Sequence, residues 1–192
     1  MWFTTDITAL VAGALRLATA AWAVLLPTLS LAVATLFAIV PAGLGDDWRF
    51  VPALLPVALA HYWTDRRLTD TDAPALPALL LFASGLAIDA MTNGPLGYWA
   101  LVYLAASGFA HALGPLMMRA GLHRWVRFVL TMILVAGLAW SIASLYFASP
   151  AAVLPIGLAA AVIALAEPII ATVLAAATPA TTHRPSFADR RA

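Results

Sequence analysis

The sequence predicts an all-α membrane protein with about six transmembrane helices. Of its 192 residues, 64% are hydrophobic and 10% are charged, and the mean hydropathy is +0.95. A water-soluble domain carries about 25% charged residues, so this chain cannot cover a water-facing surface. Its apolar runs are continuous and do not alternate with a period of two, which argues against a porin-like barrel. The length, less short loops, leaves room for roughly six helices of about 20 residues.

The first apolar run extends from Ile7 to Leu44 and is too long for one upright helix. No polar turn divides it into a hairpin. We therefore expect an interfacial helix over residues 1–16, followed by the first spanning helix over residues 17–40.

Proline, glycine and charged residues separate the later apolar runs. The other helices are expected at residues 50–63, 74–91, 98–118, 128–146 and 153–176. The transmembrane domain then covers residues 1–177. Residues 178–192 contain proline, threonine and arginine and are expected to form a disordered cytoplasmic tail.

The arginines predict the orientation in the membrane. With six helices, Arg49 lies alone on one side, and the other nine arginines lie on the opposite side. The positive-inside rule then places both termini in the cytoplasm and the turn Asn93-Gly94-Pro95 on the outer face. The chain has no lysine, no cysteine and no basic block that could follow a nucleic-acid backbone, so disulfides and nucleic-acid binding are not expected.

Asp89 is one of two acidic residues within the predicted spans, where an ionisable side chain is costly and usually has a role. It lies about one turn before the outer end of the third helix. We expect its carboxylate to accept hydrogen bonds from the free amides of Gly94, Leu96 and Gly97, where the dipole of the fourth helix is positive. The glycines would let the backbone close around the carboxylate. The alternative is direct contact with an ion or a partner protein.

Glu167 is the other acidic residue, and it directly precedes Pro168. We expect it to be neutral or to pair with a histidine or arginine across the bundle. The proline frees the carbonyl about four residues back, near Ala164, because proline lacks the N–H that would bond to it. The alternative is a proton or cation site of a transporter.

His61 and His111 both fall toward the predicted cytoplasmic side, where they could meet Glu167 in a buried polar cluster. Two histidines and a carboxylate can bind a metal, but no spacing here demands it. Ser107 and His111 are four residues apart on one helix face, as a nucleophile and its base would be, without a third member or an elbow motif. We therefore expect no catalytic residue, no metal and no cofactor.

Aromatic residues near the predicted helix ends are expected to anchor the bundle at the two interfaces. Trp48, Trp99 and Tyr146 would form the outer belt, and Trp63 and Trp125 the inner one.

The segment from the third to the fourth predicted helix carries an ordered set of residues around the turn at Asn93 and Gly94. These residues are Gly85, Leu86, Asp89, Pro95, Leu96 and Gly97, and Tyr98-Trp99 opens the next apolar run. A transmembrane run G-L-x-x-D, followed by x5-P-L-G and an aromatic-led second run, resembles the MreD family of rod shape-determining membrane proteins. The resemblance covers the second to fourth helices well and the others only in hydropathy.

This resemblance implies a non-enzymatic scaffold of the bacterial cell-elongation complex in the inner membrane. Proteins of that family associate with MreC, and through it with MreB and the glycosyltransferase–transpeptidase pair that builds sidewall peptidoglycan. The implied fold is similar to the S-components of energy-coupling-factor transporters. The outward turn at residues 92–97 is then the expected place for MreC, whose bulk is periplasmic.

Two other functions remain open. A small-molecule-binding subunit of the S-component type needs a polar pocket, and few polar side chains lie in the outer half of this chain. An intramembrane hydrolase would depend on Ser107 and His111. Membrane lipid is the other expected partner of the bundle.

Overall fold

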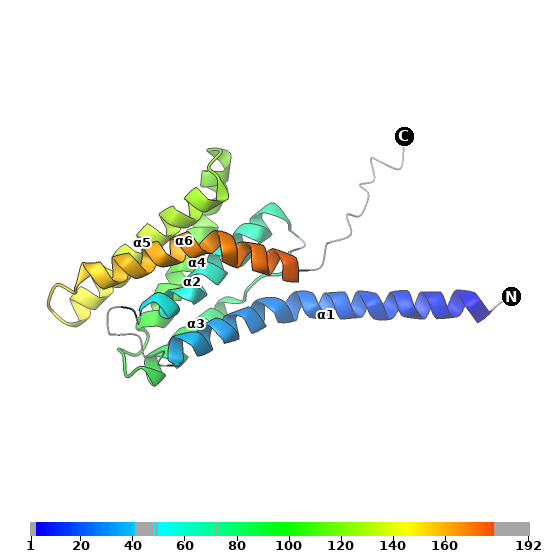
Figure 1. The fold of residues 1–192 in the computed structure, drawn as a ribbon, viewed down its shortest axis with the longest axis horizontal. Coiled ribbons are helices and arrows are strands. Elements are labelled where there is room, and N and C mark those ends of the chain that lie inside the picture. Colours follow the sequence, from blue (N-terminus) through cyan, green and yellow to red (C-terminus); the bar gives the residue numbers. More distant parts are fainter. Residues whose placement is uncertain (1–2, 41–47, 49, 72, 179–192) are drawn as a thin grey trace.

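A computed structural model describes residues 3–40, 48, 50–71 and 73–178 (Figure 1). Those residues form six helices and no strand. The helices are α1 (Phe3–Ile39), α2 (Phe50–Thr69), α3 (Ala78–Met91), α4 (Tyr98–Arg119), α5 (Arg124–Tyr146) and α6 (Val153–Ala177). The expected first loop, apart from Trp48, and the expected tail beyond Thr178 lie outside the described residues.

Four helices are long and apolar enough to cross a membrane. They are Val11–Ile39 within α1, and the whole of α4, α5 and α6. The chain is therefore a multi-pass membrane protein, as predicted. α3 has 14 residues, which makes it about 21 Å long, shorter than a typical hydrocarbon core of about 30 Å.

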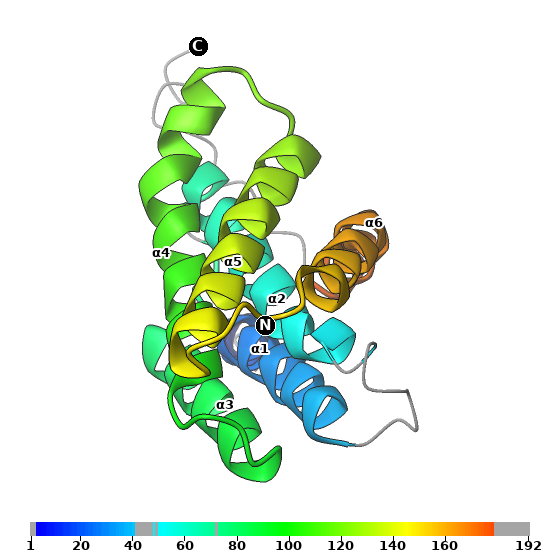
Figure 2. The same ribbon diagram turned by 90° about the vertical axis from the view of Figure 1, so that its left-hand side faces the viewer.

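α2 lies at the centre of the bundle and packs against each of the other five helices (Figure 2). From Ala53 to Asp65 every residue except Leu55 is buried. A helix with protein on all sides needs no lipid-facing stripe, so it can carry polar residues in its last turns. This position explains why the least apolar long helix of the chain is the most deeply buried.

α1 is one continuous helix, so the expected break at Arg16 is wrong. Arginine is a good helix former, and no glycine cap or proline interrupts the chain there. Pro27 is accommodated inside the helix, and the Ser30 hydroxyl donates to the Pro27 carbonyl at 2.8 Å. The N-terminal half of α1 extends beyond the other helices (Figure 1), and residues 17–22 are exposed.

Three helix boundaries differ from the sequence prediction. α2 continues to Thr69 instead of stopping at Trp63, α3 begins after Pro77, and α5 begins at Arg124 instead of Phe128. The start of α5 has a local cause, because His123 Nδ1 accepts the backbone N–H of Trp125 and caps the helix. The extension of α2 has a tertiary cause, described below.

α3 and α4 form a closely packed hairpin around Gly85. A Cβ atom added at Gly85 would overlap the backbone of Trp99 and Ala100. The missing side chain therefore lets the first turn of α4 lie directly against α3. The glycine of the G-L-x-x-D pattern has a steric role.

Gly85→Ala is expected to lower the free energy of unfolding by about 1–3 kcal/mol, because α3 and α4 must separate to admit the methyl group. Gly108→Ala is the matched control, since a Cβ at Gly108 on α4 meets nothing within 4 Å. The measurement is detergent-titrated unfolding of the purified protein. An equal effect of both substitutions would contradict the close packing.

Candidate functional site

Asp89 is completely buried at the end of α3 and holds the first turn of α4. Its Oδ2 accepts the backbone N–H of Gly97 at 2.8 Å, and its Oδ1 accepts that of Trp99 at 3.1 Å. Gly97 is the N-cap residue of α4 but has no side chain to cap with, so the acceptor comes from α3. The negative carboxylate also lies at the positive end of the α4 dipole.

The expected carboxylate clamp is present, with a partly different set of amides. Gly97 is a partner as predicted, Trp99 takes the place of Leu96, and the Gly94 N–H bonds to the Asp89 backbone oxygen at 3.0 Å. Gly97 has φ +90°, a left-handed conformation that favours glycine.

The turn that follows α3 exposes apolar side chains at its surface. Met91 is 65% exposed and Leu96 is 79% exposed. Asn93 adopts φ +54°, and the Thr92 hydroxyl donates to the Ile88 carbonyl at 2.7 Å. The turn is thus fixed from inside by Asp89 and presents its apolar residues outward.

A pocket of about 510 Å³ lies at this end of the bundle, which we call the Asp89 end. All six helices or their connecting turns contribute to its wall. The lining residues are Ala38, Phe50, Ala53, Ile88, Thr92, Asn93, Gly94, Pro95, Tyr98, Trp99, Ala143, Phe147, Ala151, Ala152, Pro155 and Ile156. Figure 2 looks at this end of the molecule. The wall is predominantly apolar and aromatic.

The opposite end, which we call the arginine end, contains a buried ion pair between α2 and α5. The Nε and Nη2 atoms of Arg127 donate to Asp65 Oδ1 at 3.0 and 2.6 Å, and Nη1 donates to the Leu122 carbonyl at 2.7 Å. The Asp65 and Arg127 side chains are only 8% and 10% exposed. The sequence predicted that Asp65 lies in a loop, but it is a buried residue of α2. Because its carboxylate is paired inside the bundle, α2 can continue past Trp63.

A second ion pair joins α5 to α6. Both Nε, at 3.2 Å, and Nη2 of Arg124 donate to Glu167 Oε1. The expectation that Glu167 pairs with a histidine or arginine is confirmed, with arginine as the partner. The Arg124 guanidinium also lies 5.4 Å from the centre of the Tyr62 ring on α2.

Pro168 leaves a carbonyl without its helical partner, and α5 supplies one. The indole N–H of Trp125 donates to the Ala164 carbonyl, four residues before Pro168, at 2.9 Å. The predicted free carbonyl is therefore satisfied across the α5–α6 contact. Neighbouring residues Arg124 and Trp125 thus bind α6 at two points one turn apart.

The predicted cluster of His61, His111 and Glu167 is not assembled. His111 is exposed on α4, and α4 does not pack against α6, which carries Glu167. His61 is buried against the Phe128 ring, and neither of its ring nitrogens has a partner among the described residues. Within that part of the chain, no three histidine, aspartate or glutamate residues are grouped as metal ligands would be.

The Ser107 and His111 pair also lacks a catalytic arrangement. His111 Nδ1 lies 2.9 Å from the backbone carbonyl of Ser107, and no hydrogen bond joins it to the hydroxyl among the described residues. A general base must reach the proton of its nucleophile, and this nitrogen is directed at the backbone instead.

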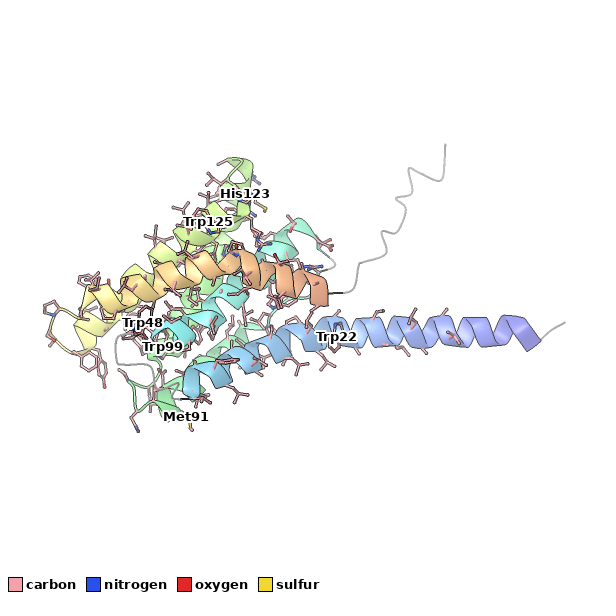
Figure 3. All side chains as sticks on the ribbon, in the orientation of Figure 1. Trp22, Trp48, Met91, Trp99, His123 and Trp125 are labelled. Atoms are coloured by element: carbon pink, nitrogen blue, oxygen red, sulfur yellow. The ribbon has the colours of Figure 1, made fainter. Side chains whose placement is uncertain are left out.

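The predicted aromatic belts are wrong at two positions. Trp63 is 0% exposed and Trp99 is 7% exposed, so both are core residues. Trp63 donates its indole N–H to the Ser30 hydroxyl at 3.2 Å. Trp48, Trp125 and Tyr146 are exposed, and Figure 3 places Trp48 at the Asp89 end and Trp125 beside the α4–α5 turn.

Comparison of the chain with models of protein families, with curated proteins and with solved structures gives no match.

Proposed function

We propose that this chain is a non-enzymatic scaffold of the bacterial cell-elongation complex, similar to the MreD family. In this proposal it crosses the cytoplasmic membrane six times with both termini inside. It binds MreC at the Asp89 end, and through MreC it helps to position MreB and the glycosyltransferase–transpeptidase pair of peptidoglycan synthesis. The proposal rests on the motif at residues 85–97 and on the geometry of that segment.

The observation that carries the proposal is the clamped α3–α4 hairpin. Gly85 and Asp89 lie one turn apart on α3, and both hold the start of α4. Gly85 has no side chain and so allows close packing, and Asp89 accepts two backbone N–H groups. Gly97, the N-cap residue of α4, adopts a left-handed backbone conformation. The hairpin is thereby fixed while Leu96 stays exposed. A rigid apolar turn is suited to binding a partner, because little conformational entropy is lost on association.

The arrangement of arginines supports the proposed orientation. Arg66 and Arg67 lie in the last turn of α2, Arg119 ends α4, and Arg124 begins α5. These helix termini belong to the arginine end in the hairpin topology, and an excess of arginine marks the cytoplasmic side. The Asp89 end then faces the periplasm, where an MreC-like partner has its bulk.

Leu96→Glu is the substitution that tests the proposed partner surface. We expect it to abolish co-purification with MreC, because a carboxylate would have to be desolvated in an apolar contact. The melting temperature should stay that of the wild type, since Leu96 is 79% exposed. Leu145→Glu is the matched control, because Leu145 is 82% exposed in the last turn of α5, on the other hairpin. It should retain MreC.

Depletion of the protein in cells gives the second readout. The proposal predicts loss of rod shape and of MreC localisation, both restored by the wild type and by Leu145→Glu but not by Leu96→Glu. Unchanged cell width and MreC localisation after deletion would refute it.

A small-molecule-binding subunit of the S-component type is the second candidate, and the 510 Å³ pocket is the observation that favours it. A pocket of this size is in the usual range for small ligands, about 300–1,000 Å³. Its apolar wall offers few groups to a polar vitamin. A thermal-shift screen of vitamins and metals tests the candidate: a saturable shift at micromolar concentration would support it, and no shift would remove it.

A further inference from the structure

The pocket at the Asp89 end has no acidic or basic side chain among the described residues of its wall. Asp89 is near, but its two carboxylate oxygens are occupied by the amides of Gly97 and Trp99. A charged group would lose its hydration among these described residues without gaining a counter-charge from them, so they favour an uncharged ligand portion.

Water is also a poor occupant of the pocket. A buried water needs two to four polar partners, and an apolar cavity stays dry. Two of the polar side chains in the wall already have internal acceptors: the Tyr98 hydroxyl donates to the Ala139 carbonyl at 3.1 Å, and Thr92 donates to Ile88. An empty space of about 510 Å³ would deprive the aromatic wall of packing contacts. A hydrocarbon chain would restore these van der Waals contacts without needing hydrogen-bond partners.

The mouth of the pocket is continuous with apolar surface. Phe147 lines the pocket and is 62% exposed, and Leu96, next to the lining residue Pro95, is 79% exposed. Val153 and Leu154, which precede the lining residue Pro155, are 60% and 71% exposed. None of these mouth residues is charged, so among the described residues a hydrocarbon chain can pass from exposed apolar surface into the pocket. Asn93 lies exposed at the same mouth, where its amide can meet an ester oxygen.

We propose that this pocket holds the hydrocarbon tail of a membrane lipid from the leaflet at the Asp89 end, with the headgroup left outside beside Asn93. The tail lies among Phe50, Trp99 and Ile156, beneath the α3–α4 and α5–α6 turns. This proposal does not depend on the scaffold function, because it rests only on the wall and the mouth of the pocket. It adds a structural ligand to the fold.

Two buried residues make the proposal testable. Ile88 and Ile156 line the pocket but are only 1% and 5% exposed, so bulk lipid around the protein does not reach them. The full-length protein is reconstituted with a phospholipid that carries a photoreactive diazirine near the end of one acyl chain. After irradiation, mass spectrometry maps the labelled residues. We expect label on Ile88 and Ile156 in addition to the exposed Leu165.

A second probe, with the diazirine in the headgroup, separates tail from headgroup. It should label the mouth at Asn93 and leave Ile88 unlabelled. Equal labelling of Ile88 by both probes, or no labelling of Ile88 and Ile156 by the tail probe, would overturn the proposal. These outcomes need no variant and do not depend on MreC.

A substitution that fills the pocket, compared with the same substitution on an exposed face, tests whether the pocket is the binding site. Ala143→Phe places a ring in the wall on α5 and is expected to abolish tail labelling of Ile88 while labelling of Leu165 persists. Ala161→Phe, on the exposed face of α6, should label as the wild type does. Persistence of the Ile88 label in a folded Ala143→Phe protein would contradict the pocket as the binding site.

Discussion

Replacing Asp65 with alanine is expected to lower the free energy of unfolding by about 3–5 kcal/mol, because it leaves the Arg127 guanidinium buried without its counter-charge. The two side chains are 8% and 10% exposed, and Arg127 places two of its donors on one carboxylate oxygen. One donor keeps the Leu122 carbonyl, which does not neutralise the charge. Detergent-titrated unfolding followed by circular dichroism measures the loss.

The double substitution Asp65→Leu with Arg127→Met is the decisive control. Apolar residues of similar volume often replace a buried ion pair without loss of stability. The double variant should therefore be more stable than Asp65→Ala, although it lacks both charges. If the double variant is less stable than Asp65→Ala, then the pair itself contributes net stability and the cost of an unpaired arginine does not explain the loss.

The Asp65 pair also shows why the sequence underestimated α2. Asp65-Arg66-Arg67 resembles a water-exposed loop by composition, and the partner that keeps Asp65 buried lies 62 residues away at Arg127. The composition around Asp65 cannot predict a partner so far away in the sequence. Once the pair exists, the carboxylate no longer needs water and the helix continues through it to Thr69.

The Asp89 clamp was predictable because its chemistry is local. Gly97 follows Asp89 by only eight residues, and both the glycines and the turn are visible in the chain. The partner of Glu167 was predictable in type but not in position, since several arginines lie toward the same end. The histidine cluster failed because depth in the membrane does not fix helix rotation: His111 is on the exposed face of α4.

In the hydrogen bond from Trp125 to Ala164, the acceptor was predictable from the sequence and the donor was not. The free carbonyl follows directly from Pro168 and could be named from the sequence. Its donor could not, because Trp125 at a predicted interface suits membrane anchoring equally well. Likewise, Trp63 and Trp99 match the composition of a belt, yet the central position of α2 and the closeness of α3 and α4 put both in the core.

Replacing Asp89 with alanine is expected to lower the free energy of unfolding by about 2–5 kcal/mol. Two backbone amides would lose their acceptor in a place closed to water, and each unsatisfied buried donor costs about 1–3 kcal/mol. The α4 dipole would also lose its counter-charge. Asp89→Asn keeps the volume and one acceptor oxygen, so its loss should be about half as large.

The Asp89 series also separates the two roles open to this carboxylate. A clamp predicts that stability falls in the order wild type, Asn, Ala, and that co-purification with MreC, the proposed partner, falls only as the hairpin loosens. A direct partner contact predicts full stability in Asp89→Ala with MreC lost. Because both carboxylate oxygens face α4 amides and the side chain is 0% exposed, no atom of Asp89 is left for a partner to touch. We therefore expect the clamp order, with Leu96→Glu as the variant that loses the partner and keeps the fold.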